Sequence, residues 1–430
     1  MPRVGVDTDI DVRLIQSTPG RGLVQVVGSS HLESIIVMGA GSTGAAIAHD
    51  LALRGYLVTL VERGEIASGT TGRNHALLHS GGRYAVKDPE AAQECMRENQ
   101  ILRRICPGVI EQVGGLFVAI DEEDEAYLVS FLVGCAESGI PTEVIGREEA
   151  LRLEPELNPA VRLAVKVPDG VFDPFRLVAS FVATAQANGV RVLPFCRVVG
   201  FIQDGRGVSG VRVVSDIRGS AMELKADLVI NATGPWGGKV AEMAGARVPV
   251  MPSAGVMVAL DRRLSRRVVN RLRKPGDGDI IVPQRATSLI GTTSWTVDEL
   301  EPVPVPRDHI VRMVEEGARL IPAARHTPIK ASFSSARPLI SGNLESDGRE
   351  VSRGFQTFDH GARDGIPGLV SVSGGKTTTS RAMAEHVGNL IGRLTGRDIP
   401  CRTAEVPLAP YYQYRLLGGL PEARREAVAP

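Results

Sequence analysis

The sequence has no excess of charge of either sign: 49 Lys and Arg residues balance 49 Asp and Glu residues over 430 positions. Proteins that bind nucleic acid through its phosphates usually carry a basic excess, so this balance argues against a nucleic-acid partner. The sequence also lacks any uninterrupted apolar run of roughly 18 residues, the length a membrane-spanning helix needs. Contact with a membrane is therefore expected to be peripheral.

Cysteine is scarce as well, and the five cysteines are scattered without a C-x-x-C pair. This pattern argues against a disulfide framework and against a metal or iron–sulfur centre. The first thirty residues contain Asp7, Asp9 and Asp11, whereas a secretory signal has a basic start followed by an apolar core. We therefore expect a cytoplasmic protein, free or at the inner face of the cytoplasmic membrane.

Two short apolar runs, residues 35–38 and 56–61, flank a stretch in which apolar positions from Ala45 to Ala52 recur at helical spacing. A strand, a turn, a helix and a second strand in this order form the opening unit of a doubly wound parallel sheet. The same patterns predict further helices at 89–106 and 174–188, and further strands at 115–120, 190–193, 210–214, 226–230 and 369–372.

The turn between the first strand and helix reads Gly39-Ala40-Gly41-Ser42-Thr43-Gly44, a G-x-G-x-x-G pattern. Its glycines permit a tight turn, close approach of a pyrophosphate and close packing of helix on strand. Glu62 ends the next strand, where a carboxylate can accept hydrogen bonds from a ribose. Together these features favour a dinucleotide site over a turn that is merely structural.

A second loop follows Glu62 directly. Residues 69–84 are rich in Gly, Ser, Thr and His, which suits a flat flavin ring and a tightly held diphosphate better than an exchangeable NAD. Gly234 follows an apolar strand in the segment 231–236 and would bring another backbone close to the same cofactor. An ordinary turn at the end of a strand is the alternative for that segment.

Residues 39–62 and the segment from Thr70 to Tyr84 resemble the large catalytic subunits of anaerobic glycerol-3-phosphate dehydrogenases. Those subunits belong to the FAD-dependent D-amino-acid-oxidase-like superfamily. The resemblance covers about residues 34–408 and continues in order through short motifs at 98–102, 167–170, 173–177, 273–275, 290–294, 337–339 and 373–376.

The resemblance implies an α/β fold in which a Rossmann-like FAD-binding domain is interleaved with an α+β substrate domain. Residues 245–350 alternate polar and apolar positions, which predicts an antiparallel sheet in the second domain. We assign the FAD-binding domain to 34–110, 173–245 and 354–408, and the substrate domain to 111–172 and 246–353. Residues 1–33 are an N-terminal extension and 409–430 a C-terminal tail.

The cofactor residues that the resemblance implies come from three turns and from the loop after Glu62. They are Gly39, Ala40, Gly41, Ser42, Thr43, Gly44, Glu62, Arg63, Ser68, Thr70, Thr71, Arg73, Asn74, Gly234, Gly374, Gly375, Lys376 and Thr377.

A phosphorylated substrate needs several donors, and the planar fork of arginine can bond two phosphate oxygens at once. The resemblance places four cations in this role, with Tyr84 beside them: Arg83, Arg337, Arg353 and Lys376. A single Arg or Lys is more often a surface cation. The resemblance also places Arg337 among the catalytic groups.

His79 is the first candidate for the catalytic base, because histidine titrates near neutral pH and this one lies in the flavin loop. The alternative is a histidine that only hydrogen-bonds the flavin or the backbone.

The sequence departs from the family at Ser380, Ala254 and Met257, where relatives carry polar or basic residues near the expected pocket. Only Cys401 follows residue 400, although many of these subunits carry a cysteine-rich C-terminal domain with an iron–sulfur cluster. Electrons are therefore expected to pass to a quinone or to a partner subunit.

Residues 262–274 contain six arginines and Lys274, with Leu264, Val268 and Leu272 at helical spacing. This stretch would suit an anionic membrane surface or a partner subunit. A solvated helix face is the simpler alternative.

The resemblance implies oxidation of sn-glycerol 3-phosphate to dihydroxyacetone phosphate by hydride transfer to flavin. Two alternatives remain open: a flavin enzyme of the same fold that acts on another small anion, such as a 2-hydroxy acid or an amino acid, and a non-catalytic flavin-binding subunit.

Overall fold

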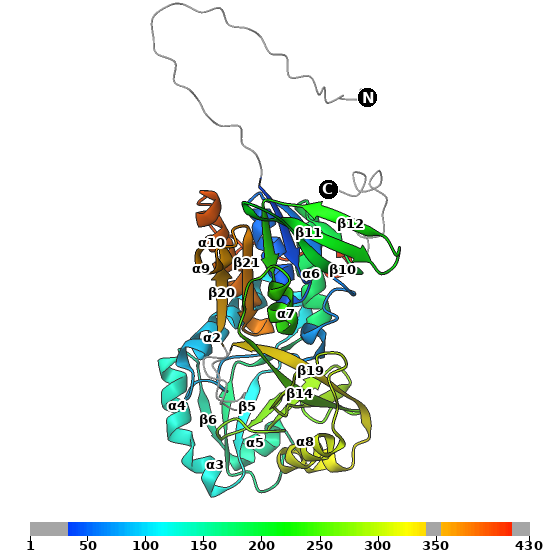
Figure 1. Ribbon diagram of the computed structural model, residues 1–430. Coiled ribbons are helices and arrows are strands. Elements are labelled where there is room, and N and C mark those ends of the chain that lie inside the picture. The colour runs from blue at the N-terminus through cyan, green and yellow to red at the C-terminus, as the bar shows by residue number, and fades with distance from the viewer. Residues whose placement is uncertain (1–32, 341–353, 415–430) are drawn as a thin grey trace, which may run out of the picture. The chain divides into compact units, whose positions relative to one another are not determined.

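A six-stranded sheet carries the glycine turn at the end of one of its central strands (Figure 1). The computed structural model describes residues 33–340 and 354–414. Five strands are parallel, as the sequence predicts, and β20 runs antiparallel to its neighbour. In spatial order the strands are β20 (Phe355–Asp359), β21 (Leu369–Gly374), β13 (Leu228–Asn231), β1 (Ser34–Met38), β2 (Leu57–Val61) and β9 (Arg191–Leu193).

Strand β1 is buried on both faces, as its continuous apolar run predicts. Ile35 and Val37 pack into the core formed with α1 (Ser42–Leu53), α6 (Pro174–Ala187) and α10 (Ser380–Thr395). Ile36 and Met38 point to the opposite core, which includes α7 (Gly237–Glu242) and a small sheet. The period-two alternation of a strand thus divides one run of residues between two cores.

The small sheet contains β10 (Cys196–Asp204), β11 (Gly207–Ser215) and β12 (Ala221–Lys225), all antiparallel. The strand predicted at 210–214 therefore exists as β11. It pairs with β10 and β12 and not with the strands of the first sheet, although its segment was assigned to the FAD-binding domain together with them. A strand pattern predicts no pairing partner, and here the hairpin connections keep these strands with their chain neighbours. The segment predicted at 226–230 joins the first sheet as β13.

A second, nine-stranded sheet is mixed parallel and antiparallel, and Figure 1 shows its long strands β14 and β19. The predicted antiparallel sheet is present, although β15 and β5 pair in parallel. The exact domain boundaries stay predictions. The strands are β5 (Gly115–Ala119), β6 (Glu143–Gly146), β7 (Leu163–Val167), β14 (Val250–Leu260), β15 (Val268–Arg271), β16 (Ile280–Gln284), β17 (Thr287–Gly291), β18 (Trp295–Thr296) and β19 (Ile329–Ile340).

Two helices start at an Asp-Pro pair. The Asp88 and Asp173 side chains accept backbone N–H groups in the first turns of α2 (Pro89–Ile105) and α6, and proline follows each at the first helical position. Both helices were predicted within one residue of their ends. The remaining α-helices and strands are α3 (Glu122–Ala126), α4 (Leu128–Glu137), α5 (Arg147–Leu153), α8 (Arg307–Leu320), α9 (His360–Asp364) and a small sheet of β3 (Leu77–Leu78), β4 (Ile110–Glu111) and β8 (Gly170–Phe172).

The helix predicted in residues 262–274 is wrong, because this stretch contains strand β15 and no helix. Leu264, Val268 and Leu272 are buried. A spacing of four residues fits one face of a strand as well as one face of a helix, so the pattern could not separate the two.

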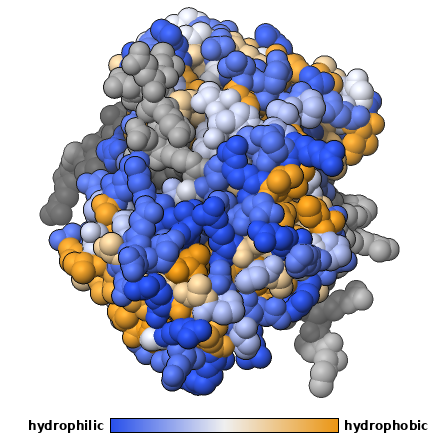
Figure 2. Space-filling model, turned by 90° about the horizontal axis from the view of Figure 1, so that it is seen from below, coloured by the Kyte–Doolittle hydropathy of each residue, from blue (hydrophilic) through white to orange (hydrophobic). Residues whose placement is uncertain are grey.

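Several arginines of the stretch are paired with carboxylates: Arg263 with Glu111 at 2.9 Å, and Arg271 with Asp124 at 2.9 Å. The helical face proposed for membrane contact is therefore not formed. The face in Figure 2 is mainly hydrophilic, with apolar residues in several separate groups. Among the described residues, no helix is both long and apolar enough to span a bilayer.

Folding buries His49 of α1 without a hydrogen-bond partner for either ring nitrogen among the described residues. Its ring packs against Phe181 of α6, with 5.8 Å between centroids. Burial lowers the pKa of His49 from 6.5 to about 4. Between these values the unfolded chain binds a proton that the folded chain rejects, so the free energy of unfolding falls as the pH falls below about 6.5.

We expect His49→Leu to remove about 2 kcal/mol of the stability loss between pH 7.5 and pH 5, measured by urea unfolding. His326→Leu, a change at an exposed histidine, is the matched control and should leave the loss as it is in the wild type. Equal acid sensitivity of all three proteins would contradict this role of His49.

Candidate functional site

The turn from β1 into α1 is built by close backbone contacts that only glycine permits. Gly39 has a φ of +96°, and a Cβ atom there would lie 2.7 Å from the carbonyl oxygen of Ala232, at the end of β13. A Cβ on Gly44 would lie 1.8 Å from the Gly39 oxygen. The glycines therefore bring the helix N-terminus and two strand ends together around one opening.

Glu62 is fixed at the end of β2 by two backbone donors. Its carboxylate accepts the N–H of Ala40 at 2.8 Å and the N–H of Gly64 at 2.9 Å. The residue also lines the cavity at this end of the sheet. A carboxylate held in this way has lone pairs left for a ribose hydroxyl.

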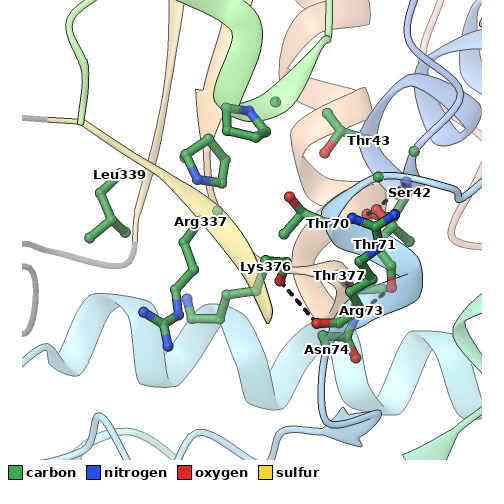
Figure 3. Close-up of a pocket in the computed structure, with 18 of the residues that line it drawn as sticks. Ser42, Thr43, Thr70, Thr71, Arg73, Asn74, Arg337, Leu339, Lys376 and Thr377 are labelled. Carbon is green, nitrogen blue, oxygen red and sulfur yellow. Dashed lines mark hydrogen bonds between the residues drawn. The ribbon is translucent and has the colours of Figure 1, made fainter. Parts of the chain in front are cut away.

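The loop after Glu62 is joined to three other elements. Thr71 Oγ1 accepts the N–H of Ser42 at 3.0 Å, and Thr70 Oγ1 donates to the Ala336 carbonyl on β19 at 2.7 Å. Asn74 Nδ2 donates to Thr377 Oγ1 at 3.3 Å. Figure 3 shows these hydroxyl and amide groups gathered beside the start of α1.

One continuous cavity of about 830 Å³ connects this glycine-rich end to the strands of the nine-stranded sheet. Its volume lies in the upper part of the range for ligand sites, ~300–1,000 Å³. Sixteen of the predicted cofactor residues line it: Gly39, Gly41, Ser42, Thr43, Glu62, Arg63, Ser68, Thr70, Thr71, Arg73, Asn74, Gly234, Gly374, Gly375, Lys376 and Thr377.

Ala40 and Gly44 do not line the cavity. Ala40 is buried and supplies the N–H that holds Glu62, whereas Gly44 supplies the space in which α1 packs on Gly39. Both therefore act on the site through the turn itself.

The predicted substrate residues lie at the other end of the cavity, with the exception of Arg353, which falls outside the described residues. In Figure 3 the side chains of Arg337 and Lys376 extend away from the group around Ser42 and Thr71. Lys376 Nζ lies 4.7 Å from the centre of the Tyr84 ring. The structure thus brings cations from distant parts of the chain to one end of a shared cavity.

Both arginines at this end are held in place by other protein groups. Arg83 donates to Asp279 at 2.7 Å and to Asn270 at 3.2 Å. Arg337 donates to the Thr293 carbonyl at 2.9 Å and to Ser253 at 3.2 Å. Their guanidinium groups are therefore oriented before any ligand binds, and Asp279 offsets part of the positive charge.

His79 is buried and lines the same end. Its ring centre lies 5.3 Å from that of Tyr84 and 5.5 Å from that of His75. The backbone around it is fixed by two buried side chains: Asn99 donates to the His79 carbonyl at 3.0 Å, and Asp169 accepts the Ser80 N–H at 2.7 Å. The motifs around residues 99 and 169 thus support the loop that carries His79.

Of the three departures from the family pattern, only Met257 lines the cavity. Ser380 is buried at the start of α10 and donates to the Thr377 carbonyl at 2.9 Å, and Ala254 is buried in β14. The expectation that all three alter the pocket wall is therefore wrong for Ser380 and Ala254. Spacing in a sequence does not show which face of a strand or helix reaches a cavity.

Sequence reasoning missed several contributors to the cavity wall, among them Trp236, Lys274 and His75. Trp236 stacks under Arg63, with 4.0 Å between the guanidinium carbon and the ring centre. Lys274 and His75 line the substrate end. His75 lies four residues before His79 in a loop already predicted to face the flavin, and that spacing was the available signal.

A family model described as FAD dependent oxidoreductase matches residues 34–390. Among curated proteins, the chain is 44% identical to a subunit of the anaerobic glycerol-3-phosphate dehydrogenase of Escherichia coli K12, over 88% of this chain and 70% of that protein. It is also 44% identical to a subunit of the anaerobic glycerol-3-phosphate dehydrogenase of Haloferax volcanii, over 87% and 66%. These matches confirm the resemblance predicted from the motifs.

Solved structures show the same fold at lower identity. Glycerol-3-phosphate dehydrogenase from Bacillus halodurans, complexed with FAD, superposes with a TM-score of 0.66 at 24% identity, over 88% of this chain and 68% of that one. L-proline dehydrogenase from P. horikoshii gives 0.70 at 22% identity, over 90% and 98%.

The predicted α/β fold and the predicted FAD dependence are both confirmed by these comparisons. With its glycine turn, its fixed Glu62 and the cavity that these residues line, the chain belongs to the FAD dependent oxidoreductase family.

Proposed function

We propose that this chain oxidises sn-glycerol 3-phosphate to dihydroxyacetone phosphate. The observation that carries the proposal is the single cavity that joins the FAD-type glycine turn to a cationic end formed by Arg83, Arg337 and Lys376. Relatives at 41–44% identity are named for the same activity.

The described residues fit FAD. The tight turn that Gly39 and Gly44 permit leaves Gly41 and Ser42, at the N-terminus of α1, in the cavity wall, where a diphosphate could approach. Glu62 would hold the ribose, while Thr71 and Asn74, with the turn that ends at Thr377, would lie along the rest of the cofactor. Bound FAD would supply the acceptor for the hydride that leaves the carbinol carbon.

The substrate phosphate would bind at the cationic end. Arg83 and Arg337 are already oriented by their protein partners, so little side-chain entropy would be lost when the phosphate binds. Lys376 lies over Tyr84 and adds a third positive charge. The carbinol carbon would then lie between this end and the flavin loop.

His79 is our candidate for the group that accepts the hydroxyl proton when the C=O bond forms. Its backbone is held by Asn99 and its ring packs against Tyr84, so its position is fixed before substrate binds. The alternative role, a hydrogen bond to flavin or backbone, would leave the acid limb of the pH–rate profile unchanged in His79→Gln.

A second candidate function is oxidation of another small anion, such as a 2-hydroxy acid or an amino acid. L-proline dehydrogenase and glycine oxidase share this fold. Arg83 and Arg337 already donate hydrogen bonds to protein groups, so an anion with fewer oxygens than a phosphate could also satisfy them. A non-catalytic flavin-binding role is the third candidate, which substrate reduction of the flavin would exclude.

Transfer of the electrons to a quinone or to a partner subunit is part of the proposal, since the Escherichia coli relative is named as one subunit of its enzyme. A cytoplasmic location, with peripheral contact at the inner face of the membrane, likewise remains a proposal.

The purified chain should show a flavin absorbance spectrum that bleaches under anaerobic conditions when glycerol 3-phosphate is added. A 2-hydroxy acid and proline, added separately, are the comparison substrates. Bleaching by one of them and not by glycerol 3-phosphate would move the assignment to the second candidate function.

Glu62→Gln should raise the dissociation constant for FAD by about tenfold, because the amide loses the charge and one of its two atoms can no longer accept an N–H. Fluorescence quenching during FAD titration of the apoprotein measures this constant. Glu65→Gln, a change next to Gly64, is the control. Equal affinity in both variants would remove Glu62 from the cofactor site.

Lys376→Met should raise the KM for glycerol 3-phosphate by about 10-fold or more, because a charged partner of the phosphate is lost. Steady-state kinetics with an artificial electron acceptor measures the change. Lys225→Met, at an exposed lysine of β12, should leave KM unaltered. A KM effect that is as large for a 2-hydroxy acid would indicate a general anion site.

A further inference from the structure

His75 lies in the wall of the cationic end, in the short segment between Arg73 and β3. Its Cδ2 atom would lie 3.8 Å from a Cβ placed on Gly291, at the end of β17. The charged groups that face it are Arg83 and Arg337, and His79 contacts it edge-on. The residue thus belongs to the region assigned above to the substrate phosphate.

The backbone fixes which ring nitrogen of His75 carries the proton. The N–H of Leu77 donates to Nδ1 at 3.3 Å, so Nδ1 is an acceptor. A neutral imidazole with an accepting Nδ1 carries its hydrogen on Nε2. Within residues 33–340 and 354–414, Nε2 makes no hydrogen bond, so this N–H is left for a ligand.

The surroundings keep this histidine neutral. Burial, together with the positive charges of Arg83 and Arg337, lowers the pKa of His75 to about 3. A positively charged imidazole would be repelled by the guanidinium groups of Arg83 and Arg337. A neutral imidazole adds a directed hydrogen-bond donor without adding charge. Because Nε2 already carries a hydrogen and Nδ1 accepts the N–H of Leu77, the ring has no free site for a substrate proton.

We propose that His75 donates its Nε2–H to an anionic oxygen of the substrate, beside Arg83 and Arg337, and thereby sets substrate affinity while a different group accepts the proton. The inference rests on the proposed function and adds a substrate-binding residue to that site. The shared ligand chemistry is an oxyanion, so phosphate and carboxylate substrates are both candidates for the acceptor.

Two amide substitutions separate the two nitrogens of the ring. In His75→Asn the amide oxygen can take the place of Nδ1 and accept from Leu77, but nothing reaches the position of Nε2. In His75→Gln the amide N–H can reach that position. The pair therefore removes or keeps the proposed donor while the side chain stays polar and neutral.

For each variant, KM and kcat for glycerol 3-phosphate are measured together with the dissociation constant of dihydroxyacetone phosphate, read from the flavin absorbance without turnover. We expect His75→Asn to raise KM and the product's dissociation constant about tenfold, and His75→Gln to change them less than about threefold. In both variants kcat and the acid limb of the pH profile should stay close to the wild type. His75→Ala, a second variant without the donor, should match His75→Asn and serves if that protein does not fold.

Wild-type affinities in His75→Asn and His75→Ala would overturn the inference while leaving the proposed function intact. A collapse of kcat with loss of the acid limb would also overturn it, because His75 would then be the base. Loss of FAD from all variants would indicate a structural role.

If the wild-type flavin responds neither to glycerol 3-phosphate nor to dihydroxyacetone phosphate, the proposed function itself fails, and this inference falls with it for these ligands. A matching His75→Asn effect on a carboxylate substrate would then be required to retain it.

Discussion

The close backbone contact between Gly39 and Ala232 is the constraint on which the rest of the site depends. A carbonyl oxygen 2.7 Å from where a Cβ would stand leaves no room for any side chain. The same contact sets the distance between the ends of β1 and β13 and, through Gly44, the start of α1. Glu62 is then oriented by an N–H of this turn, so the cofactor end is shaped mainly by backbone atoms. Backbone positions vary less than side-chain rotamers, which suits a tightly held cofactor.

At the substrate end the constraint is electrostatic, because several positive charges lie in one cavity before a ligand binds. Asp279 pairs with Arg83, and neutral hydroxyl and carbonyl groups surround Arg337. Two cations can then share one cavity at a lower electrostatic cost than unpaired charges would have. Burial, together with the same positive charges, lowers the pKa of His75 and leaves it as a neutral donor. Cations and histidine are therefore one coupled arrangement.

The segment from Thr70 to Tyr84 connects the two ends. It touches the start of α1 through Thr71 and carries His79 to the substrate end, where Asn99 and Asp169 fix its backbone. Because one short segment serves both cofactor and substrate, the sequence could predict its importance from composition and resemblance. Asn99 and Asp169 stood out as parts of motifs. Their contacts with the loop join residues about 20 and 90 positions apart in the chain, and contacts over such distances leave no local pattern in the sequence.

The sequence by itself determined the opening βαβ unit, the glycine turn, the carboxylate at the end of β2 and the family, because each rests on local spacing and on backbone geometry within a few turns of chain. Only the tertiary structure decided which strands pair, that residues 262–274 contain a strand, that Arg83 is balanced by Asp279, and that Ser380 and Ala254 stay out of the cavity. It also decided the protonation of His75, which depends on burial and then on the charges of Arg83 and of Arg337 from β19. Those outcomes follow from contacts between residues far apart in the chain, and a one-dimensional pattern contains the periodicity of an element but not the identity of its neighbours.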